Sequence, residues 1–247
     1  MRLAIVAACC LLIIVALLQP STVHSDQSGV AYSIPLMGRW SSYTINVSIP
    51  AEPAWAHDMV VSALQNWTLA QEWFAANYYP NGRIYHLNQT SQGANVTVEF
   101  NATISAAGET PSWKKSNGEF VVAQVVLNSG IFTQPVPQPF VNCVVLHEFG
   151  HVLGLSHVND PQGDLMNPVL GGVCSISTLD LYAVHFLGEL SNTSTVPGSV
   201  TLPPQIPYEH VYAIPLPEFS ALPVVFVLAF VIVAMGATGT HKRRKRL

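Results

Sequence analysis

The spacing of apolar residues along the chain predicts a strand followed by a long helix. Residues 43–49 alternate between apolar and polar side chains, which is typical of a strand that is buried on one face. From Ala54 to about Tyr79 the apolar residues instead recur three and four positions apart, as they do on one face of a helix. Pro50 and Pro53 separate the two patterns and end the strand before the helix begins.

The following segment predicts the rest of a sheet. Residues 83–89 and 94–103 have strand patterns. Residues 110–115 and 119–128 flank Asn117-Gly118, a dipeptide that favours a tight hairpin turn. Together with the first strand, these segments predict a twisted mixed sheet of about five strands.

Two further helices are expected after the sheet. A proline-rich run over residues 134–139 ends the strand region, and a helix begins near Phe140. Ser177 is a residue type that caps helices, and Asp180 follows three positions later in the first turn. The order of elements predicts an α+β fold with three main helices.

Both ends of the chain are apolar. Residues 1–25 are predicted to be a signal peptide, because Arg2 precedes an apolar run that is shorter than the roughly 20 residues of a membrane span. An uncleaved signal anchor is the alternative interpretation. Residues 219–240 are long and apolar enough to cross a bilayer, and the basic tail over residues 241–247 is expected to stay in the cytoplasm.

The part between these ends divides into a folded domain over residues 26–190 and a proline-rich stalk over residues 191–218. Pro217-Glu218-Phe219, directly before the apolar span, is similar to a class of archaeal C-terminal sorting signals, so the tail is a candidate for processing. The expected location is outside the cell, anchored to the membrane through the C-terminal span.

Charge and cysteine content narrow the possible partners. Between the apolar ends, four basic side chains stand against fourteen acidic ones, a net charge near −10, which does not suit a phosphate backbone. Nucleic acid is therefore not an expected partner.

Six Asn-x-Ser/Thr sequons, against about two expected by chance, indicate an exported glycoprotein. Outside the signal peptide only Cys143 and Cys174 remain, which favours one disulfide, with two buried free thiols as the alternative.

The helix that begins near residue 140 carries a metal-binding pattern. Residues 147–157 read His-Glu-Phe-Gly-His-Val-Leu-Gly-Leu-Ser-His. His147 and His151 are four positions apart, so on a helix they lie on one face and can bind one metal ion. Gly154 permits the positive φ that ends a helix, after which the chain can turn so that His157 reaches the same ion. Three imidazoles and an open fourth position are typical of a catalytic zinc site.

Glu148 supplies the carboxylate that such a site needs for hydrolysis. Zinc lowers the pKa of a bound water to about 7 and polarises a peptide carbonyl. Glu148 would take the proton from the water and pass it to the departing amine. Composition alone would give the whole motif in about 4 of 100,000 chains of this length, so incidental histidines on a helix are excluded as its explanation.

The pattern His-Glu-x-x-His-x-x-Gly-x-x-His is the zinc motif of the metzincin peptidases, and the chain matches it at every fixed position. The five residues 164–168, Asp-Leu-Met-Asn-Pro, resemble the methionine turn of the matrixins, in which Met166 would be a floor for the zinc site and not a ligand. With the order of elements, the resemblance covers roughly residues 38–190. It implies a matrixin-like peptidase domain, one catalytic Zn²⁺ ion and protein or peptide substrates. Calcium and a second zinc are not assigned, and Val158 stands where matrixins commonly have serine.

The resemblance also implies how the cleft is built. In metzincins a peptide adds antiparallel to the edge strand of the sheet, which places residues 110–115 beside the substrate, where Lys114 and Lys115 could attract acidic side chains. In matrixins the position of Cys143 lines the S1′ pocket, and the segment of Cys174 forms its far wall. A disulfide between them would fix the depth of that pocket.

The predicted function is zinc-dependent endoproteolysis outside the cell. The alternative, from another class, is a non-catalytic cell-surface adhesion module that keeps zinc for structure. Glu148 discriminates between the two, because a purely structural site needs no carboxylate at that position. The other histidines of the domain, His57, His86 and His185, are expected to be surface or core residues.

Overall fold

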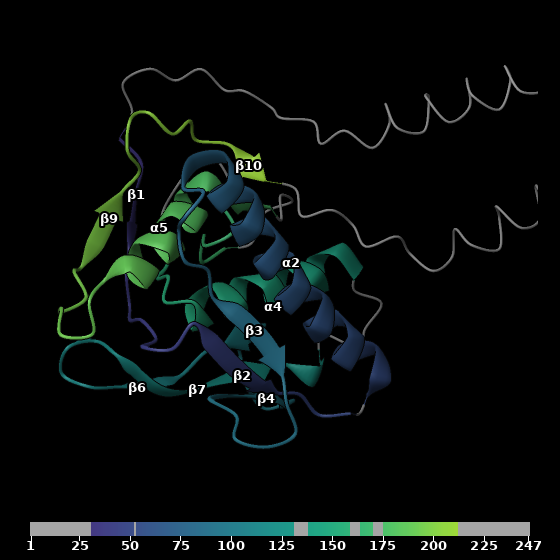
Figure 1. Cartoon of the computed structure of the whole chain (residues 1–247). Helices are drawn as coiled ribbons and strands as arrows, with labels where there is room; N and C mark the ends of the chain where they lie inside the picture. Colours follow the sequence, from purple (N-terminus) through teal and green to yellow (C-terminus); the bar gives the residue numbers. More distant parts are fainter. Residues whose placement is uncertain (1–30, 52, 131–137, 159–163, 170–174, 212–247) are drawn as a thin grey trace, which may run out of the picture. The chain divides into compact units, whose positions relative to one another are not determined.

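The structure is a computed structural model that describes residues 31–51, 53–130, 138–158, 164–169 and 175–211 (Figure 1). All of these residues belong to the first of two units of the chain, residues 1–213. No helix within the described ranges is long and apolar enough to cross a membrane. The predicted signal peptide, membrane span and basic tail lie outside these ranges.

A mixed sheet forms one layer of the domain. Its parallel part has the order β3 (His86–Gln89), β2 (Thr44–Ser48), β4 (Val96–Phe100) and β7 (Phe120–Leu127). Two short strands, β5 (Gly108–Glu109) and β6 (Ser112–Lys114), follow each other along the outer edge of β7 and pair with it antiparallel. The predicted sheet of about five strands is confirmed, with an edge strand that is interrupted between residues 109 and 112.

The hairpin between β6 and β7 turns at the predicted dipeptide. Gly118 has a φ of +84°, a backbone conformation that glycine adopts readily because it has no Cβ. Gly118 N donates to Lys115 O at 3.0 Å, and Lys115 N donates to Glu119 O at 2.8 Å. The turn pairs β6 with β7, and because the other side of β7 pairs with β4, the β5–β6 segment lies at the edge of the sheet.

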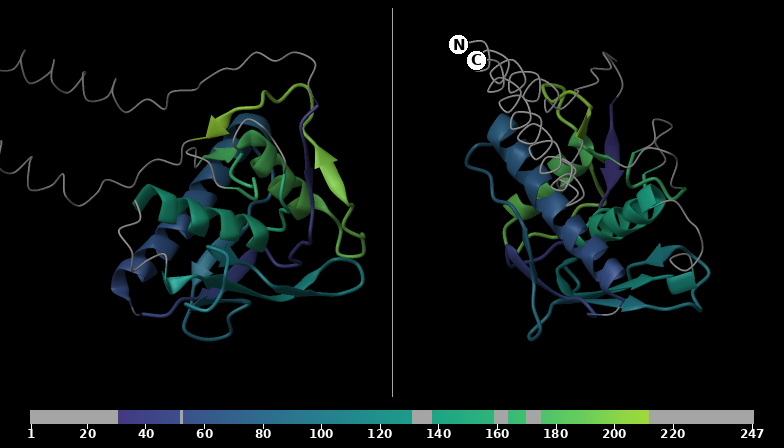
Figure 2. Two further views of the ribbon diagram at one scale, coloured as in Figure 1. Left: turned by 180° about the vertical axis from the view of Figure 1, so that it is seen from behind. Right: turned by 90° about the vertical axis from the view of Figure 1, so that its right-hand side faces the viewer.

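Three helices complete the layer beside the sheet: α2 (Ala54–Tyr78), α4 (Gln138–Val152) and α5 (Thr178–Glu189). Figures 1 and 2 show α2 and α4 on the same side of the strands in every view. Trp67 of α2 is fully buried, and its indole Nε1 donates to Leu146 O of α4 at 2.9 Å. The three predicted helices are confirmed, and Trp67 joins α2 to α4 in the core.

The start of α5 has the predicted capping box. Ser177 Oγ accepts a hydrogen bond from Asp180 N at 3.1 Å, and Asp180 Oδ2 accepts one from Ser177 N at 2.9 Å. Both side chains are fully buried. Two backbone N–H groups that the helix cannot satisfy by itself are therefore paired inside the domain.

The predicted stalk is wrong for residues 199–211. Within it, β9 (Ser199–Thr201) pairs antiparallel with β1 (Ser33–Pro35), and β10 (His210–Val211) pairs with β8 (Ile176–Ser177). Four apolar side chains of this segment are at most 8% exposed, and they are Val200, Leu202, Ile206 and Tyr208. They are scattered among prolines without a period, so their spacing predicts neither a helix nor a strand, yet each of the four is buried against the domain. The folded domain therefore extends beyond residue 190, to at least residue 211.

Candidate active site

The helix α4 places three polar side chains of the motif on the cleft side of the domain. His147 and His151 follow each other by one turn, and Glu148 lies beside them. His147 is 5% and Glu148 is 4% exposed, although the rest of this helix is mostly apolar. Buried ionisable groups on an apolar helix are unfavourable unless they are paired or bind a metal, which marks this turn as functional.

Gly154 ends α4 and reverses the chain. Its φ is +100°, in the left-handed region that favours glycine. Leu155 N donates to Gly150 O at 3.0 Å, and Gly154 O accepts from Met37 N at 2.8 Å, so the turn is fixed on both sides. The sequence prediction that Gly154 lets the chain return toward the helix is confirmed.

Replacing Gly154 by alanine should lower the free energy of unfolding by about 3 kcal/mol or more, since a left-handed alanine costs about 1–2 kcal/mol and overpacking costs more. An added Cβ would lie 2.1 Å from the carbonyl oxygen of Gly38, which belongs to the backbone and cannot rotate away. Urea unfolding of the zinc-free chain measures the effect.

Gly93→Ala is the matched control for this substitution. Gly93 also has a positive φ, +65°, but nothing lies within 4 Å of an added Cβ. Gly93→Ala should lower the free energy of unfolding only by the cost of a left-handed alanine, about 1 kcal/mol. Equal losses in the two variants would show that the close approach of Gly38 to Gly154 has no energetic weight.

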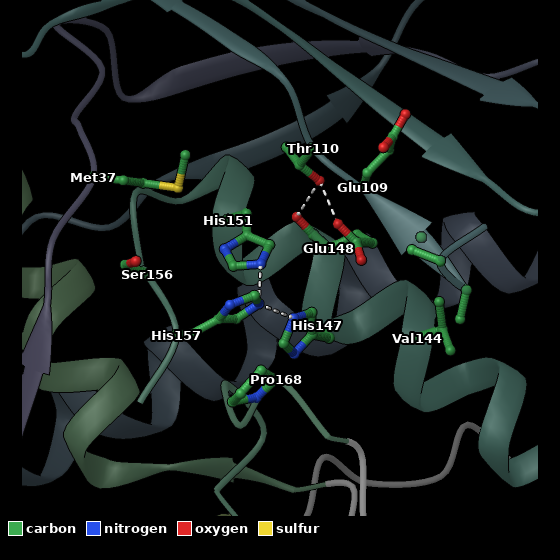
Figure 3. A pocket seen from close by; sticks show the side chains of 13 residues that line it. Met37, Glu109, Thr110, Val144, His147, Glu148, His151, Ser156, His157 and Pro168 are labelled. Carbon is green, nitrogen blue, oxygen red and sulfur yellow. Dashed lines mark hydrogen bonds between the residues drawn. The ribbon is translucent and has the colours of Figure 1, made fainter. Parts of the chain in front are cut away.

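The three motif histidines converge. His157 Nε2 lies 3.1 Å from His147 Nε2 and 3.1 Å from His151 Nε2 (Figure 3). Zinc–nitrogen bonds of about 2.05 Å in a tetrahedral site separate neighbouring ligand nitrogens by about 3.3 Å, so the observed spacing fits a zinc ion. In the part of the chain that the structure describes, these three residues are the one group of His, Cys, Asp and Glu side chains arranged to hold a metal.

Hydrogen bonds at the other ring nitrogens determine the tautomers on α4. His147 Nδ1 lies 2.7 Å from Leu165 O, and His151 Nδ1 lies 2.8 Å from Leu155 O. A carbonyl oxygen only accepts, so both Nδ1 atoms carry hydrogen and both Nε2 atoms present lone pairs to the centre of the group. His157 Nε2 carries one hydrogen at most, so it can donate to only one of the two lone pairs of His147 and His151. A metal cation can bind both.

Burial keeps these imidazoles neutral, which is the form that binds metal. Desolvation, reinforced by the neighbouring ring of His147, lowers the pKa of His151 to about 3. Desolvation also lowers the pKa of His147 and of His157. The donor set, its geometry and its protonation therefore all fit Zn²⁺.

Glu148 faces the same cleft from beside the histidines. Its Oε2 accepts a hydrogen bond of 2.7 Å from Thr110 Oγ1, a residue between β5 and β6 (Figure 3). Burial raises the pKa of Glu148 to about 7, and the bond from Thr110 opposes that rise. The cleft has a volume of about 400 Å³ and is lined by the edge strand, the histidines and Pro168.

The methionine of residues 164–168 lies beneath α4. Met166 is fully buried, and a Cβ added to Gly150 would lie 2.3 Å from its sulfur, so the thioether packs directly against this bare position of the helix. Val158 N donates to Met166 O at 3.0 Å, and Leu165 O holds His147. The turn thus packs against α4, and through Leu165 it also orients a histidine.

Asp164 anchors this turn through contacts that the sequence did not reveal. Its Oδ1 accepts from Met166 N at 2.9 Å. Its Oδ2 accepts from Ser177 Oγ at 2.7 Å and from Tyr208 OH at 3.1 Å. The segment that was predicted to be a stalk therefore supports the floor of the site, through Tyr208.

Several other predicted residues have different outcomes. Lys114 Nζ donates to Met37 O at 2.7 Å, and Lys115 forms a 2.8 Å ion pair with Glu119, so both lysines already have partners within the chain. The suggestion that they attract acidic substrate residues is therefore not supported.

Cys143 is buried one turn before His147, but Cys174 lies outside the described residues. The predicted disulfide between them stays a prediction.

The other histidines of the domain lie apart from the cleft group, as predicted. His185 stacks on Tyr79 with ring centroids 4.1 Å apart, and His57 contacts Asp58 and Gln89. His86 is exposed at the start of β3. None of the three belongs to the metal-binding group described above.

The site combines a helix that carries two histidines, a glycine reversal that leads to a third, and a methionine beneath them, on an α+β fold. Residues 65–185 match the matrixin peptidase family. The chain therefore carries a matrixin-like domain, of a metallopeptidase type of hydrolase.

Comparisons beyond the family give little more. No curated protein sequence matches the chain. Among solved structures, that of myroilysin is 19% identical over 51% of this chain and 55% of that one, with a TM-score of 0.34. The GM1-bound form of the ECX AB5 holotoxin is 16% identical over 68% of this chain and 84% of that one, with a TM-score of 0.35. The chain thus spans about half the length of the myroilysin chain, and scores this low add nothing to the assignment.

Proposed function

We propose that the protein is a zinc-dependent endopeptidase that hydrolyses peptide bonds of extracellular or cell-surface proteins. One observation carries the proposal: three imidazole Nε2 atoms converge, two of them 3.1 Å from the third, beside a buried carboxylate that faces an open cleft. His147, His151 and His157 would hold one Zn²⁺ ion. The proposed ligands are all neutral, so the ion keeps its positive charge for catalysis.

The zinc supplies Lewis acidity, which activates a water molecule and polarises the peptide carbonyl. Glu148 takes one proton from the water as the water oxygen bonds to the carbonyl carbon. When the carbon–nitrogen bond breaks, Glu148 gives that proton to the departing amine. Burial raises the pKa of the Glu148 carboxyl group above that of a free glutamate, which favours its uptake of the proton.

The edge strand is the proposed docking site for the substrate. The β5–β6 segment runs along the outer side of β7, and residues 108–110 line the cleft. A peptide could extend the sheet here through main-chain hydrogen bonds. Glu109 is exposed on this rim, and it is the charged group that a bound peptide would meet in place of the two lysines.

A non-catalytic zinc-stabilised adhesion module remains the alternative of a different class. The cleft of about 400 Å³ and the carboxylate of Glu148 argue against it, because a structural zinc site is closed and needs no base. The extracellular location and the membrane anchor are part of the proposal and are supported by the apolar ends and the sequons of the sequence.

Cleavage-site profiling tests the proposed function. The full-length chain, purified in mild detergent, should cut a mixed peptide pool at internal bonds, and a chelator should abolish cutting until Zn²⁺ is returned. Contact with Glu109 should enrich Lys or Arg near the cut. A zinc-loaded chain that cuts none of the peptides would instead favour the adhesion module.

A further inference from the structure

We infer that Thr110 is a positioning residue for Glu148, so that the edge strand beside the cleft also holds the catalytic base. The inference rests on the proposed function and deepens it, because it assigns a role in catalysis to a hydroxyl group outside the zinc motif. The contact spans 38 residues of sequence, between the β5–β6 segment and α4.

The first support is the hydrogen bond itself. Thr110 Oγ1 lies 2.7 Å from Glu148 Oε2, a short bond of the kind that a charged acceptor forms, and 3.3 Å from the backbone oxygen of the same residue (Figure 3). Thr110 is half-buried and Glu148 is buried, so water competes weakly for this bond. The hydroxyl therefore limits how the carboxylate can rotate.

Gly108, two residues before Thr110 on the edge of the sheet, also confines the carboxylate of Glu148. A Cβ built at Gly108 would lie 2.6 Å from Glu148 Oε1 and 2.7 Å from its Cγ. The carboxylate is thus confined by the edge strand at both oxygens: Oε2 by a hydroxyl and Oε1 by a backbone position without a side chain. Any larger residue at position 108 would displace the carboxylate.

This arrangement distinguishes the two carboxylate oxygens of Glu148. Oε2 is held by Thr110, whereas Oε1 lies against Gly108 without a hydrogen-bond donor among the described residues, and the Glu148 side chain lines the same cleft as His147 and His157. Oε1 is therefore the oxygen that would take the proton. A peptide that docks on β5–β6 contacts the same strand that holds the base, so docking and proton transfer depend on one element.

The test compares two substitutions of Thr110. Thr110→Val keeps the shape and removes the hydroxyl, and it should lower kcat about tenfold with KM changed less than about twofold, because a loosened base affects the chemical step. Thr110→Ser keeps the hydroxyl and should restore kcat to within about twofold of the wild type. Zinc content should be unchanged in both variants.

Three further measurements keep the test specific. Thr201→Val, which removes a 2.7 Å hydroxyl bond to Ser33 far from the cleft, should leave kcat unchanged. In a Glu148→Gln background, Thr110→Val should have no further effect, since Thr110 acts through Glu148. Gly108→Ala should also lower kcat, because the added methyl group would displace the carboxylate on the side of Oε1. This variant keeps the test available even if Thr110→Val folds poorly.

A readout without turnover tests the contact directly. The infrared carboxylate band of Glu148, obtained in the zinc-free chain as the difference between wild type and Glu148→Gln, should shift in Thr110→Val and return in Thr110→Ser. Full kcat in Thr110→Val and Gly108→Ala, with an active wild type, would overturn the inference and leave the proposed function intact. A zinc-loaded wild type that cleaves no peptide would overturn both.

Discussion

Replacing Glu148 by glutamine should reduce kcat for peptide cleavage by about 10²- to 10⁴-fold, the range in which a general acid–base group contributes, while one zinc ion stays bound. Glutamine has the same shape and can still accept the hydrogen bond from Thr110, but it cannot take a proton at neutral pH. The three histidines are unchanged, so metal content and fold should be those of the wild type. Steady-state kinetics beside metal analysis of the same sample measure both quantities.

Glu99→Gln is the matched control for Glu148→Gln. Glu99 is an exposed carboxylate on β4, where it accepts a 2.7 Å hydrogen bond from Gln124, away from the cleft. Its replacement should not change kcat. If Glu148→Gln retained most of the wild-type turnover, Glu148 would lose its role as the base.

The second large effect is expected from His147→Ala, which should lower zinc affinity by more than about 100-fold, since loss of groups that merely orient a ligand already costs 10–100-fold. It also leaves Leu165 O without its partner on α4. Peptide cleavage should fall with the zinc content. In the wild type, zinc should raise the melting temperature, because an ion that binds only the folded chain stabilises it; in the variant this rise should disappear.

His57→Ala serves as the control for this loss. His57 lies on α2, outside the metal-binding group, so its removal should leave zinc affinity and the zinc-dependent rise in melting temperature unchanged. A His147→Ala variant that binds zinc as tightly as the wild type would exclude His147 as a ligand.

The parts of the site that could be predicted from the sequence involve residues that lie close together along the chain. His147 and His151 are related by one helical turn, and Gly154 and His157 follow within a few residues, so helix geometry and one reversal are enough to predict that they converge. The capping box of α5 and the hairpin at Gly118 were predictable for the same reason. Each of these features lies within one short, continuous stretch of the sequence.

The parts that the sequence did not predict are contacts between distant segments. Thr110 and Glu148 meet because β5–β6 pairs with β7 and α4 crosses beneath that edge, which no spacing in the sequence encodes. Tyr208 reaches Asp164 from a proline-rich segment whose few apolar residues have no periodicity. The spacing of residues along the chain therefore reveals the motif but not the distant residues that support it.

The most direct test of the central claim is the zinc coordination of the purified full-length chain, by metal content together with X-ray absorption at the zinc edge. We expect one zinc per chain with three nitrogen ligands at about 2.0–2.1 Å and one further light-atom ligand, an open site of the catalytic kind. A closed site with sulfur ligands, or a folded chain that binds no zinc, would contradict it.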